Sequence, residues 1–152
     1  MRLTNGFDIS SSALTAQRLR MDVISSNIAN ADTTRTKMVN GKWVPYTRKI
    51  VTIEPKEQAP FSSVLQGAMN GASGGFGEGV KVTKIGEDSA PFKQVYNPTH
   101  PDADENGFVM MPNVDILKEM VDMISATRSY EANVTALNAS KAFVTKALEI
   151  GK

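Results

Sequence analysis

The chain has 152 residues, of which 41% are hydrophobic and 7% aromatic, and its 17 basic and 16 acidic side chains leave a net charge of +1. This balance gives no electrostatic preference for nucleic acid or anionic lipid, and the absence of cysteine excludes disulfides and thiolate metal sites. The sequence contains no run of the roughly 18 apolar residues that a membrane-spanning helix needs, and its N-terminus lacks the apolar core of a cleaved secretion signal. We therefore expect any export from the cytoplasm to use a route without a cleaved signal peptide.

Apolar residues recur in alternating steps of four and three along the first 31 positions, and only Ser10 and Gln17 interrupt them. This spacing keeps the residues on one side of a slightly underwound helix, which needs a partner helix alongside it. We predict a helix over residues 5–31, within an N-terminal helical segment 1–33. The stripe consists of Leu3, Phe7, Ser10, Leu14, Gln17, Met21, Ile24, Ile28 and Ala31.

The spacing of apolar residues changes in a central segment, residues 34–112, which we predict to consist of short strands and loops. Asn40-Gly41 favours a hairpin turn, and six of the eleven glycines lie in residues 67–79, which predicts a flexible stretch. The expected strands are residues 43–46, 49–53, 80–85, 92–96 and 108–111.

A second helix is predicted over the C-terminal segment 113–152, with Asn113 as its N-cap and Asp115 in its first turn. It repeats the same apolar spacing, interrupted only at Thr127 and Lys141. The stripe consists of Ile116, Met120, Met123, Thr127, Tyr130, Val134, Leu137, Lys141, Val144 and Leu148. A second apolar edge is formed by Val114, Leu117, Val121 and Ile124.

Residues 125–140 carry only two charges, Arg128 and Glu131, and are rich in Ser, Thr and Ala. A helix with a solvated face normally carries charge there, so this composition indicates that several helices surround the segment. We expect Ala132 to Ser140 to meet adjacent subunits.

These patterns predict a mainly α fold with a small β insertion, in which the two terminal helices pair as an antiparallel coiled coil. We expect four residues of the first helix to pack against four of the second, and Val144 and Leu148 to extend the helix-pairing and assembly interface. The two groups are Leu14, Met21, Ile24 and Ile28, and Met123, Tyr130, Val134 and Leu137.

The residue types found in catalytic and metal sites do not form a convincing constellation. Asp102-x-Asp104-x-Asn106-Gly107 matches the start of a calcium-binding loop, but the twelfth position is Asn113 where a bidentate Glu is required. His100 is the only histidine and the chain has no cysteine, so the ligands of a usual zinc site are missing. A serine nucleophile would also have only His100 as its base. We predict no catalytic, cofactor or metal residues and read the Asp102 segment as an acidic turn.

Three blocks of sequence resemble the axial proteins of the bacterial flagellum, and among them a component of the proximal rod. The first is residues 12–33, which contains the motif Asn27-Ile28-Ala29-Asn30. The second is residues 96–115, from Tyr96-Asn97-Pro98 to Met111-Pro112-Asn113-Val114-Asp115, and the third is Arg128-Ser129-Tyr130-Glu131-Ala132-Asn133.

The resemblance implies a structural subunit without catalytic activity or cofactor, which transmits torque in the rod outside the cytoplasmic membrane. It further implies export unfolded through the flagellar type III apparatus, and partners that are copies of the chain and other axial proteins, with no nucleic acid or small-molecule substrate. The alternatives are a soluble coiled-coil adaptor or secretion chaperone and, on the Asp102 loop alone, a calcium-binding module.

Overall fold

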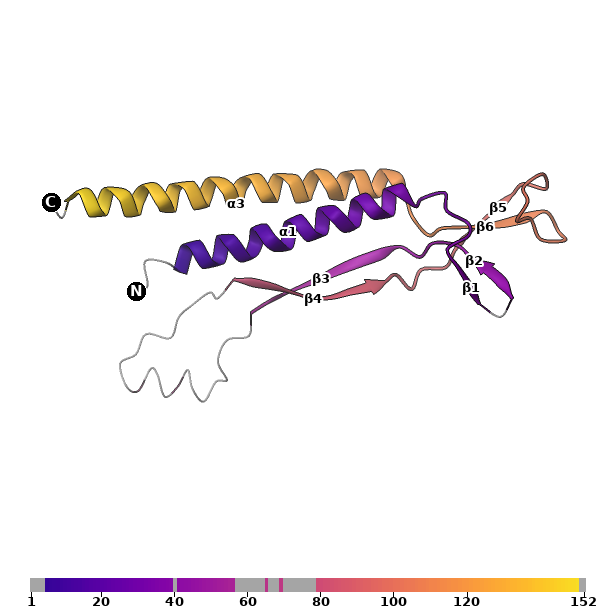
Figure 1. The fold of residues 1–152 in the computed structure, drawn as a ribbon, viewed down its shortest axis with the longest axis horizontal. Helices are drawn as coiled ribbons and strands as arrows, with labels where there is room; N and C mark the ends of the chain where they lie inside the picture. Colours follow the sequence, from indigo (N-terminus) through magenta and orange to yellow (C-terminus); the bar gives the residue numbers. More distant parts are fainter. Residues whose placement is uncertain (1–4, 40, 57–64, 66–68, 70–78, 151–152) are drawn as a thin grey trace. The chain divides into compact units, whose positions relative to one another are not determined.

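The computed structural model describes residues 5–39, 41–56, 65, 69 and 79–150 (Figure 1). In the order of the chain, one long helix comes before the described strands and another comes after them. The strands form three two-stranded sheets, β1–β2, β3–β4 and β5–β6. The predicted combination of terminal helices with small antiparallel hairpins between them is thus confirmed. The elements are α1 (Asn5–Ala29), β1 (Lys37–Val39), β2 (Lys42–Val44), β3 (Lys49–Pro55), β4 (Val80–Glu87), β5 (Lys93–Tyr96), β6 (Phe108–Met111) and α3 (Ile116–Ile150).

Helix α1 ends at Ala29, two residues before the predicted position, because Asn30 closes its last turn. The backbone amide and the side-chain Nδ2 of Asn30 both donate to the carbonyl oxygen of Ser26, at 3.2 and 2.8 Å. Asn30 Oδ1 in turn accepts from Thr33 Oγ1 at 3.3 Å. Leu3, the first member of the predicted stripe, lies outside the described residues.

The β1–β2 hairpin pairs Lys37 with Val44 and Val39 with Lys42 across the predicted turn, where Gly41 adopts a φ of 77°. A left-handed backbone angle of this kind suits glycine because it has no Cβ. The expected strand over residues 43–46 stops at Val44. Tyr46 leaves the hairpin and, 6% exposed, joins a small buried cluster with Ala31 and Val114.

The other predicted strands are present, and β3 and β4 each extend two residues further than expected. In β5–β6, Lys93 pairs with Met111 and Tyr96 with Phe108. Of the glycine-rich stretch 67–79, only Met69 and Gly79 lie among the described residues, so the predicted flexibility falls outside the part described.

Gly79 brings the start of β4 against α1. Its φ is 84°, and a Cβ added there would overlap Ser12 Oγ. The same hydroxyl accepts a hydrogen bond from the backbone amide of Val80 at 3.1 Å and donates to the carbonyl of Ile9 at 2.7 Å. The close approach therefore needs both a glycine at 79 and a short hydroxyl side chain at 12.

Helix α3 begins at Ile116, and the prediction that Asn113 is its N-cap is wrong. Asp115 Oδ1 accepts from the backbone amides of Leu117 at 3.1 Å and Lys118 at 3.5 Å, which is the N-cap arrangement. The side-chain amide of Asn113 instead bonds to the Arg48 amide and the Ala90 carbonyl.

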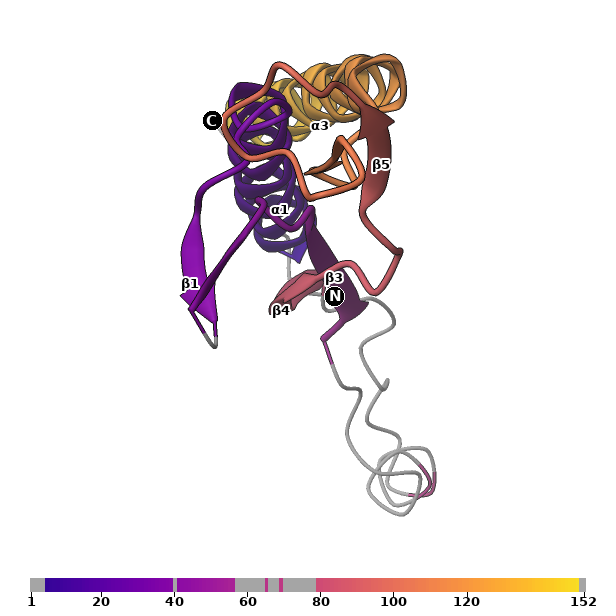
Figure 2. The ribbon, with the colours of Figure 1, turned by 90° about the vertical axis from the view of Figure 1, so that its right-hand side faces the viewer.

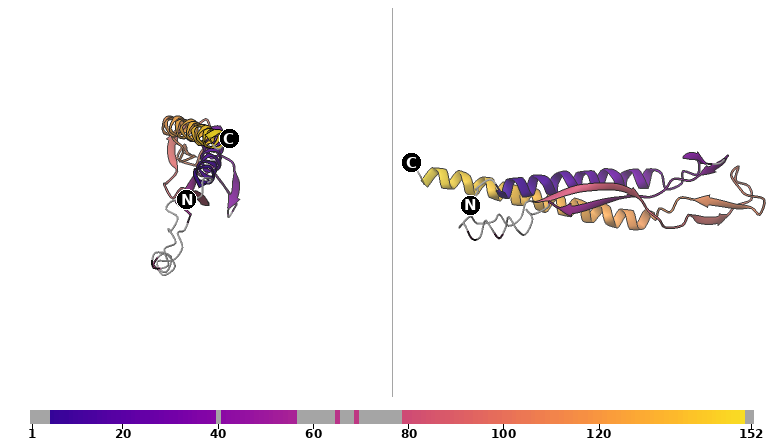
Figure 3. Two further views of the ribbon diagram at one scale, coloured as in Figure 1. Left: turned by 90° about the vertical axis from the view of Figure 1, so that its left-hand side faces the viewer. Right: turned by 90° about the horizontal axis from the view of Figure 1, so that it is seen from below.

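Backbone contacts divide the chain into two units, one formed by residues 1–19, 53–83 and 126–152 and the other by 20–52 and 84–125. In the second unit, both the β1–β2 and the β5–β6 hairpins project beyond the end of α1 and the start of α3 (Figure 3). Seen from that end, they are separate ribbons rather than one sheet (Figure 2). Within the described residues, no helix has the length and apolar character required to cross a membrane.

Candidate functional site

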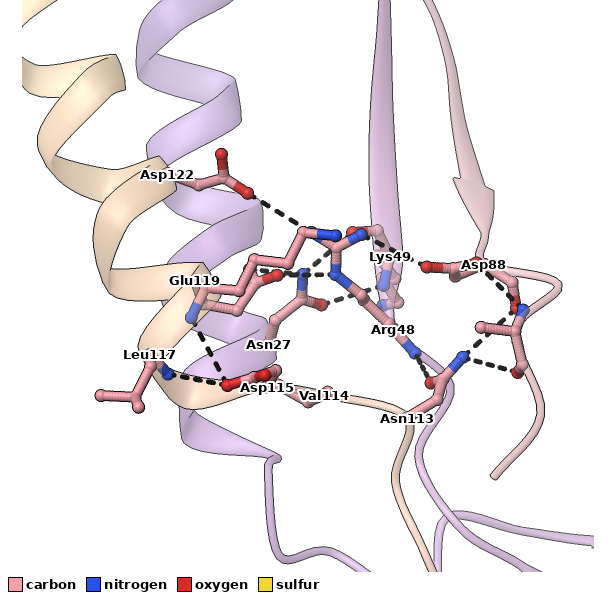
Figure 4. Close-up of polar contacts among 12 residues, drawn as sticks. Asn27, Arg48, Lys49, Asp88, Asn113, Val114, Asp115, Leu117, Glu119 and Asp122 are labelled. Atoms are coloured by element: carbon pink, nitrogen blue, oxygen red, sulfur yellow. Dashed lines mark hydrogen bonds and ion pairs between the residues drawn. The ribbon is translucent and has the colours of Figure 1, made fainter. Parts of the chain in front are cut away.

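A cluster of six polar side chains joins the end of α1, the start of β3, the residues after β4 and the first turns of α3 (Figure 4). All of them belong to the second unit. We call this cluster the polar junction. Its members are Asn27, Arg48, Asp88, Asn113, Glu119 and Asp122.

Asn27, from the predicted family motif, is 1% exposed and uses its whole side-chain amide. Its Oδ1 accepts from the backbone amide of Lys49 at 2.9 Å and from the Tyr46 hydroxyl at 3.0 Å. Its Nδ2 donates to the Lys49 carbonyl at 2.9 Å and to Glu119 Oε2 at 3.0 Å. One side chain thereby connects α1, β3 and α3, and none of its hydrogen-bonding capacity is left unused.

Arg48 lies between three carboxylates of the polar junction. Its Nε donates to Glu119 Oε1 at 2.6 Å, and its terminal nitrogens lie 3.2 Å from Asp88 Oδ2 and 3.5 Å from Asp122 Oδ2 (Figure 4). Glu119 is 0% exposed, so Arg48 and Asn27, rather than water, compensate the charge of its carboxylate. Burial lowers the pKa of the Arg48 guanidinium, but the hydrogen bonds and charges of Glu119 and Asp88 outweigh it and raise the pKa overall.

Asn113 and Asp88 attach the backbone on the far side of Arg48. Asn113 Oδ1 accepts from the Arg48 amide at 2.8 Å, and its Nδ2 donates to the Ala90 carbonyl at 3.0 Å. The Asp88 amide donates to the Arg48 carbonyl at 2.8 Å. The backbone amide of Ala90, followed by the guanidinium of Arg48, holds the pKa of the Asp88 carboxyl below its ordinary value.

Two further contacts connect α1 with α3, one in each unit. In the second unit, Arg20 lies 3.5 Å from Asp122, with both side chains about one-third exposed. In the first unit, a Cβ on Gly6 would lie 3.5 Å from Ser140 Oγ. Later residues of α1 thus meet earlier residues of α3.

The first turns of α3 expose a continuous apolar stripe on the side away from Glu119, at about 100° of helix per residue. We call it the α3 stripe. Its members are Ile116 (43% exposed), Leu117 (76%), Met120 (51%), Val121 (66%) and Ile124 (60%). A helix face of this kind in water is typical of a surface that binds a protein partner.

The predicted interface residues differ in burial. Ile24 is buried at 5% exposure, whereas Leu148 is 72% exposed. The remaining eight are half-buried: Leu14, Met21, Ile28, Met123, Tyr130, Val134, Leu137 and Val144. On the predicted motif, Asn27 enters the polar junction and Asn30 ends the helix, while Ile28 is half-buried and Ala29 is exposed.

Sequence reasoning missed Arg48, Asp88, Glu119 and Asp122. Nothing in their local sequence distinguishes them from solvated charges, because their partners lie 40 or more residues away in the chain. It also missed that the buried face of α3 includes Glu119 and Ala126, both 0% exposed, while Ile116 and Met120 of the predicted stripe are exposed.

The acidic turn at Asp102 lies in the connection between β5 and β6, as predicted. Its carboxylate accepts from Thr34 Oγ1 at 2.9 Å and Arg35 Nε at 2.6 Å, and the Arg35 hydrogen bond lowers the Asp102 pKa. The same side chain borders a cavity of about 410 Å³ lined also by Trp43 and Met110. Among the described residues, no three His, Asp or Glu side chains gather closely enough to hold a metal ion.

Comparison with known proteins places these features in a family. Residues 7–37 match the model of the flagella basal body rod protein, and residues 105–149 match that of the flagellar basal body rod FlgEFG protein C-terminal region. The first range covers all of α1 except its first two residues and includes the Asn motif, and the second covers all of α3 except Ile150 and includes the α3 stripe.

Three relatives illustrate the similarity over the whole chain, and each is named flagellar basal-body rod protein FlgC. That of Bacillus subtilis is 60% identical over 152 residues, which is all of both chains. That of Borreliella burgdorferi is 44% identical over 99% of this chain and 98% of its own, and that of Salmonella typhimurium is 42% identical over all of both. With this identity across its full length, the chain belongs to the FlgC family of flagellar basal-body rod proteins.

Proposed function

We propose that this chain is a structural subunit of the flagellar basal-body rod and that it acts by packing its two helices together and against neighbouring subunits. The observation that supports this most directly is the similarity to named rod proteins over the whole chain, up to 60% identity. That family is structural and is not a known enzyme family. The comparisons give no support to an adaptor, a chaperone or a calcium-binding module.

Within the subunit, α1 and α3 pair in antiparallel orientation. The contacts of Asn27 with Glu119, Arg20 with Asp122, and Gly6 with Ser140 support this, because residue numbers rise along α1 as they fall along α3. The half-buried Leu14, Met21, Tyr130 and Val134 are suited to the seam between the helices. Extensive side-by-side contacts between helices make an assembly stiff, and a part that transmits torque must be stiff.

Between subunits, the α3 stripe binds an apolar helix of a neighbouring rod subunit. Its five side chains are between 43% and 76% exposed, and Leu117 is the most exposed of them. A head-to-tail contact whose rotation does not close produces an open helical array, which is the arrangement that a rod requires. The neighbours are copies of this chain or other axial proteins, and the exposed Leu148 near the end of α3 adds a second contact.

The place of action is the rod, outside the cytoplasmic membrane, reached through the flagellar type III export apparatus without a cleaved signal peptide. The proposal is tested by complementation. A motile bacterium lacking its own rod protein of this family should regain swimming and external filaments when it expresses this chain.

The α3 stripe is tested in the same strain with Val121→Glu combined with Ile124→Glu. We expect the variant to be exported but not assembled, because two charges on the stripe oppose burial against a neighbour. Lys118→Glu, which changes the charge of an exposed residue on the same turn, should leave swimming intact and serves as the control. Normal swimming of the double variant would exclude the α3 stripe as the contact, and failure of the unaltered chain would count against the rod assignment itself.

A further inference from the structure

We propose that the buried contact between Asn27 and Glu119 determines the register in which α1 pairs with α3. This inference rests on the antiparallel pairing proposed above and adds which residues select one alignment among several. The contact is direct, with Asn27 Nδ2 donating to Glu119 Oε2 at 3.0 Å, and the two side chains are 1% and 0% exposed.

The apolar spacing alone does not select a register. Stripes that repeat every seven residues can be brought together again after a slip of seven residues along either helix. The small residues of both helices add little discrimination, because an alanine or serine fits against many neighbours. Buried polar contacts discriminate, since a slipped alignment leaves their donors and acceptors without partners.

A slip of seven residues disrupts the Asn27–Glu119 contact in either direction. In one direction Asn27 would face Ala126, which offers no polar side chain, and Glu119 would face a position beyond the end of α1. In the other direction Glu119 would face Arg20, but Asn27 would lie opposite Pro112, before the start of α3. Both slips leave the Asn27 amide without its carboxylate.

Both side chains are also held from a third side, so neither can follow a slipping helix. Asn27 is bonded to the Lys49 backbone through two hydrogen bonds of 2.9 Å, and Glu119 accepts from Arg48 Nε at 2.6 Å. Lys49 and Arg48 are adjacent in the chain. The start of β3 therefore sets the positions of Asn27 and Glu119 along their helices together.

The contact between Gly6 and Ser140 in the first unit has the same helix register as the contact between Asn27 and Glu119. Gly6 lies 21 residues before Asn27, and Ser140 lies 21 residues after Glu119. This equals three seven-residue repeats on each helix. The alignment selected at Asn27 is thus the alignment in which Gly6 meets Ser140.

The absence of cysteine makes the register measurable by disulfide formation between engineered pairs. The purified full chain would carry Gly6→Cys with Ser140→Cys, which reports the observed register. Gly6→Cys with Asn133→Cys, or with Ala147→Cys, reports slips of seven residues. In the otherwise unaltered chain, we expect the first pair to oxidise several-fold faster than the other two.

The same three cysteine pairs are then introduced into a chain that carries both Asn27→Leu and Glu119→Leu, which we call the leucine variant. We expect the preference for Gly6→Cys with Ser140→Cys to disappear, so that the three pairs oxidise at similar rates. Circular dichroism of helix content checks that the leucine variant is folded. If it does not fold, Glu119→Ala and Glu119→Gln replace it. Glutamine retains an oxygen that accepts from Asn27, although its amide nitrogen then replaces the acceptor of Arg48 Nε, whereas alanine retains no acceptor.

Glu119→Gln should keep the preference and Glu119→Ala should lose it. A preference that persists in the leucine variant, or equally in both Glu119 variants, would overturn the assignment of register to this contact. A chain in which none of the three pairs oxidises, with Asn27 and Glu119 intact, would instead contradict the helix pairing. Complementation of swimming tests the rod assignment separately from both.

Discussion

Asn27 binds Lys49 as a neighbouring β-strand would, with its Oδ1 accepting from the Lys49 amide and its Nδ2 donating to the Lys49 carbonyl, both at 2.9 Å. The first residue of β3 thereby has its backbone groups satisfied by a helix side chain. Only an amide side chain offers a donor and an acceptor in this arrangement. This gives a physical reason for asparagine at the first position of the Asn27-Ile28-Ala29-Asn30 motif.

Asn27→Ala should lower the free energy of unfolding by at least about 2 kcal/mol, because it leaves buried groups of Lys49, Tyr46 and Glu119 without a partner. The measurement is urea unfolding followed by the fluorescence of Trp43, the only tryptophan. Asn30→Ala is the matched control, since it removes a helix-end contact to Ser26 and should cost only about 1 kcal/mol. Equal losses in the two variants would refute the role assigned to Asn27.

Arg48→Met should destabilise the chain by about 3–5 kcal/mol, because the carboxylate of Glu119 then remains buried without its cation. Adding Glu119→Leu should restore part of that loss, since the unpaired charge is removed with its partner. Arg128→Met breaks an exposed ion pair with Glu131 and should change stability by no more than about 1 kcal/mol. Urea midpoints of these proteins and of Glu119→Leu alone check this, and strictly additive effects at 48 and 119 would be evidence against their coupling.

Gly79→Ala should destabilise the contact between β4 and α1 more than Gly41→Ala destabilises its hairpin. Both glycines have a positive φ, so each substitution carries a backbone cost of about 1 kcal/mol. Only at Gly79 would the new Cβ also overlap a side chain, that of Ser12, whereas the space around Gly41 is open. Thermal unfolding followed by circular dichroism measures the difference, and a larger shift for Gly41→Ala would contradict this account of the close approach.

Acidification should weaken the fold through Asp88 and Asp102, whose pKa values are both held below the ordinary 3.8. For Asp88 the main cause is the Ala90 amide, and for Asp102 it is the hydrogen bond from Arg35. A carboxyl with a lowered folded-state pKa contributes stability above its unfolded pKa, and this contribution is lost as the pH falls through the folded value.

The urea midpoint should therefore decrease as the pH falls from about 5 to values below 3.8, and Asp102→Asn should reduce that decrease. Asp104→Asn is the control, because Asp104 lies in the same loop and makes no ion pair within the part of the chain described. If both variants retain the full dependence on pH, Asp102 does not contribute to it.

The helices and strands could be predicted from local pattern because their causes are local. Asn40-Gly41 marked the turn of β1–β2, and alternation over residues 80–85 marked β4. The N-cap at Asn113 was predicted wrongly because Asp115 caps equally well and Asn113 has distant partners, Arg48 and Ala90. A pattern of neighbouring residues cannot show that distant partners bind the Asn113 side chain in place of the helix end.

The choice of helix face was beyond local pattern for the same reason. Apolar spacing marks both edges of α3 as suitable for packing, and it favoured the edge with Ile116 and Met120. The subunit buries the edge with Glu119 and Ala126, because Arg48 and Asn27 satisfy the carboxylate there. Predicting this requires knowledge that β3 returns to the end of α1, which the sequence near Glu119 does not contain.

The exposure of Leu117, Val121 and Ile124 has an energetic consequence for growth of a filament. Each such side chain releases roughly 1.5–3 kcal/mol when it is transferred from water into a fully packed interface. In the rod assembly proposed above, this free energy would be gained when a neighbouring subunit covers the α3 stripe. The hydrophobic effect would then favour the addition of each subunit without any other source of energy.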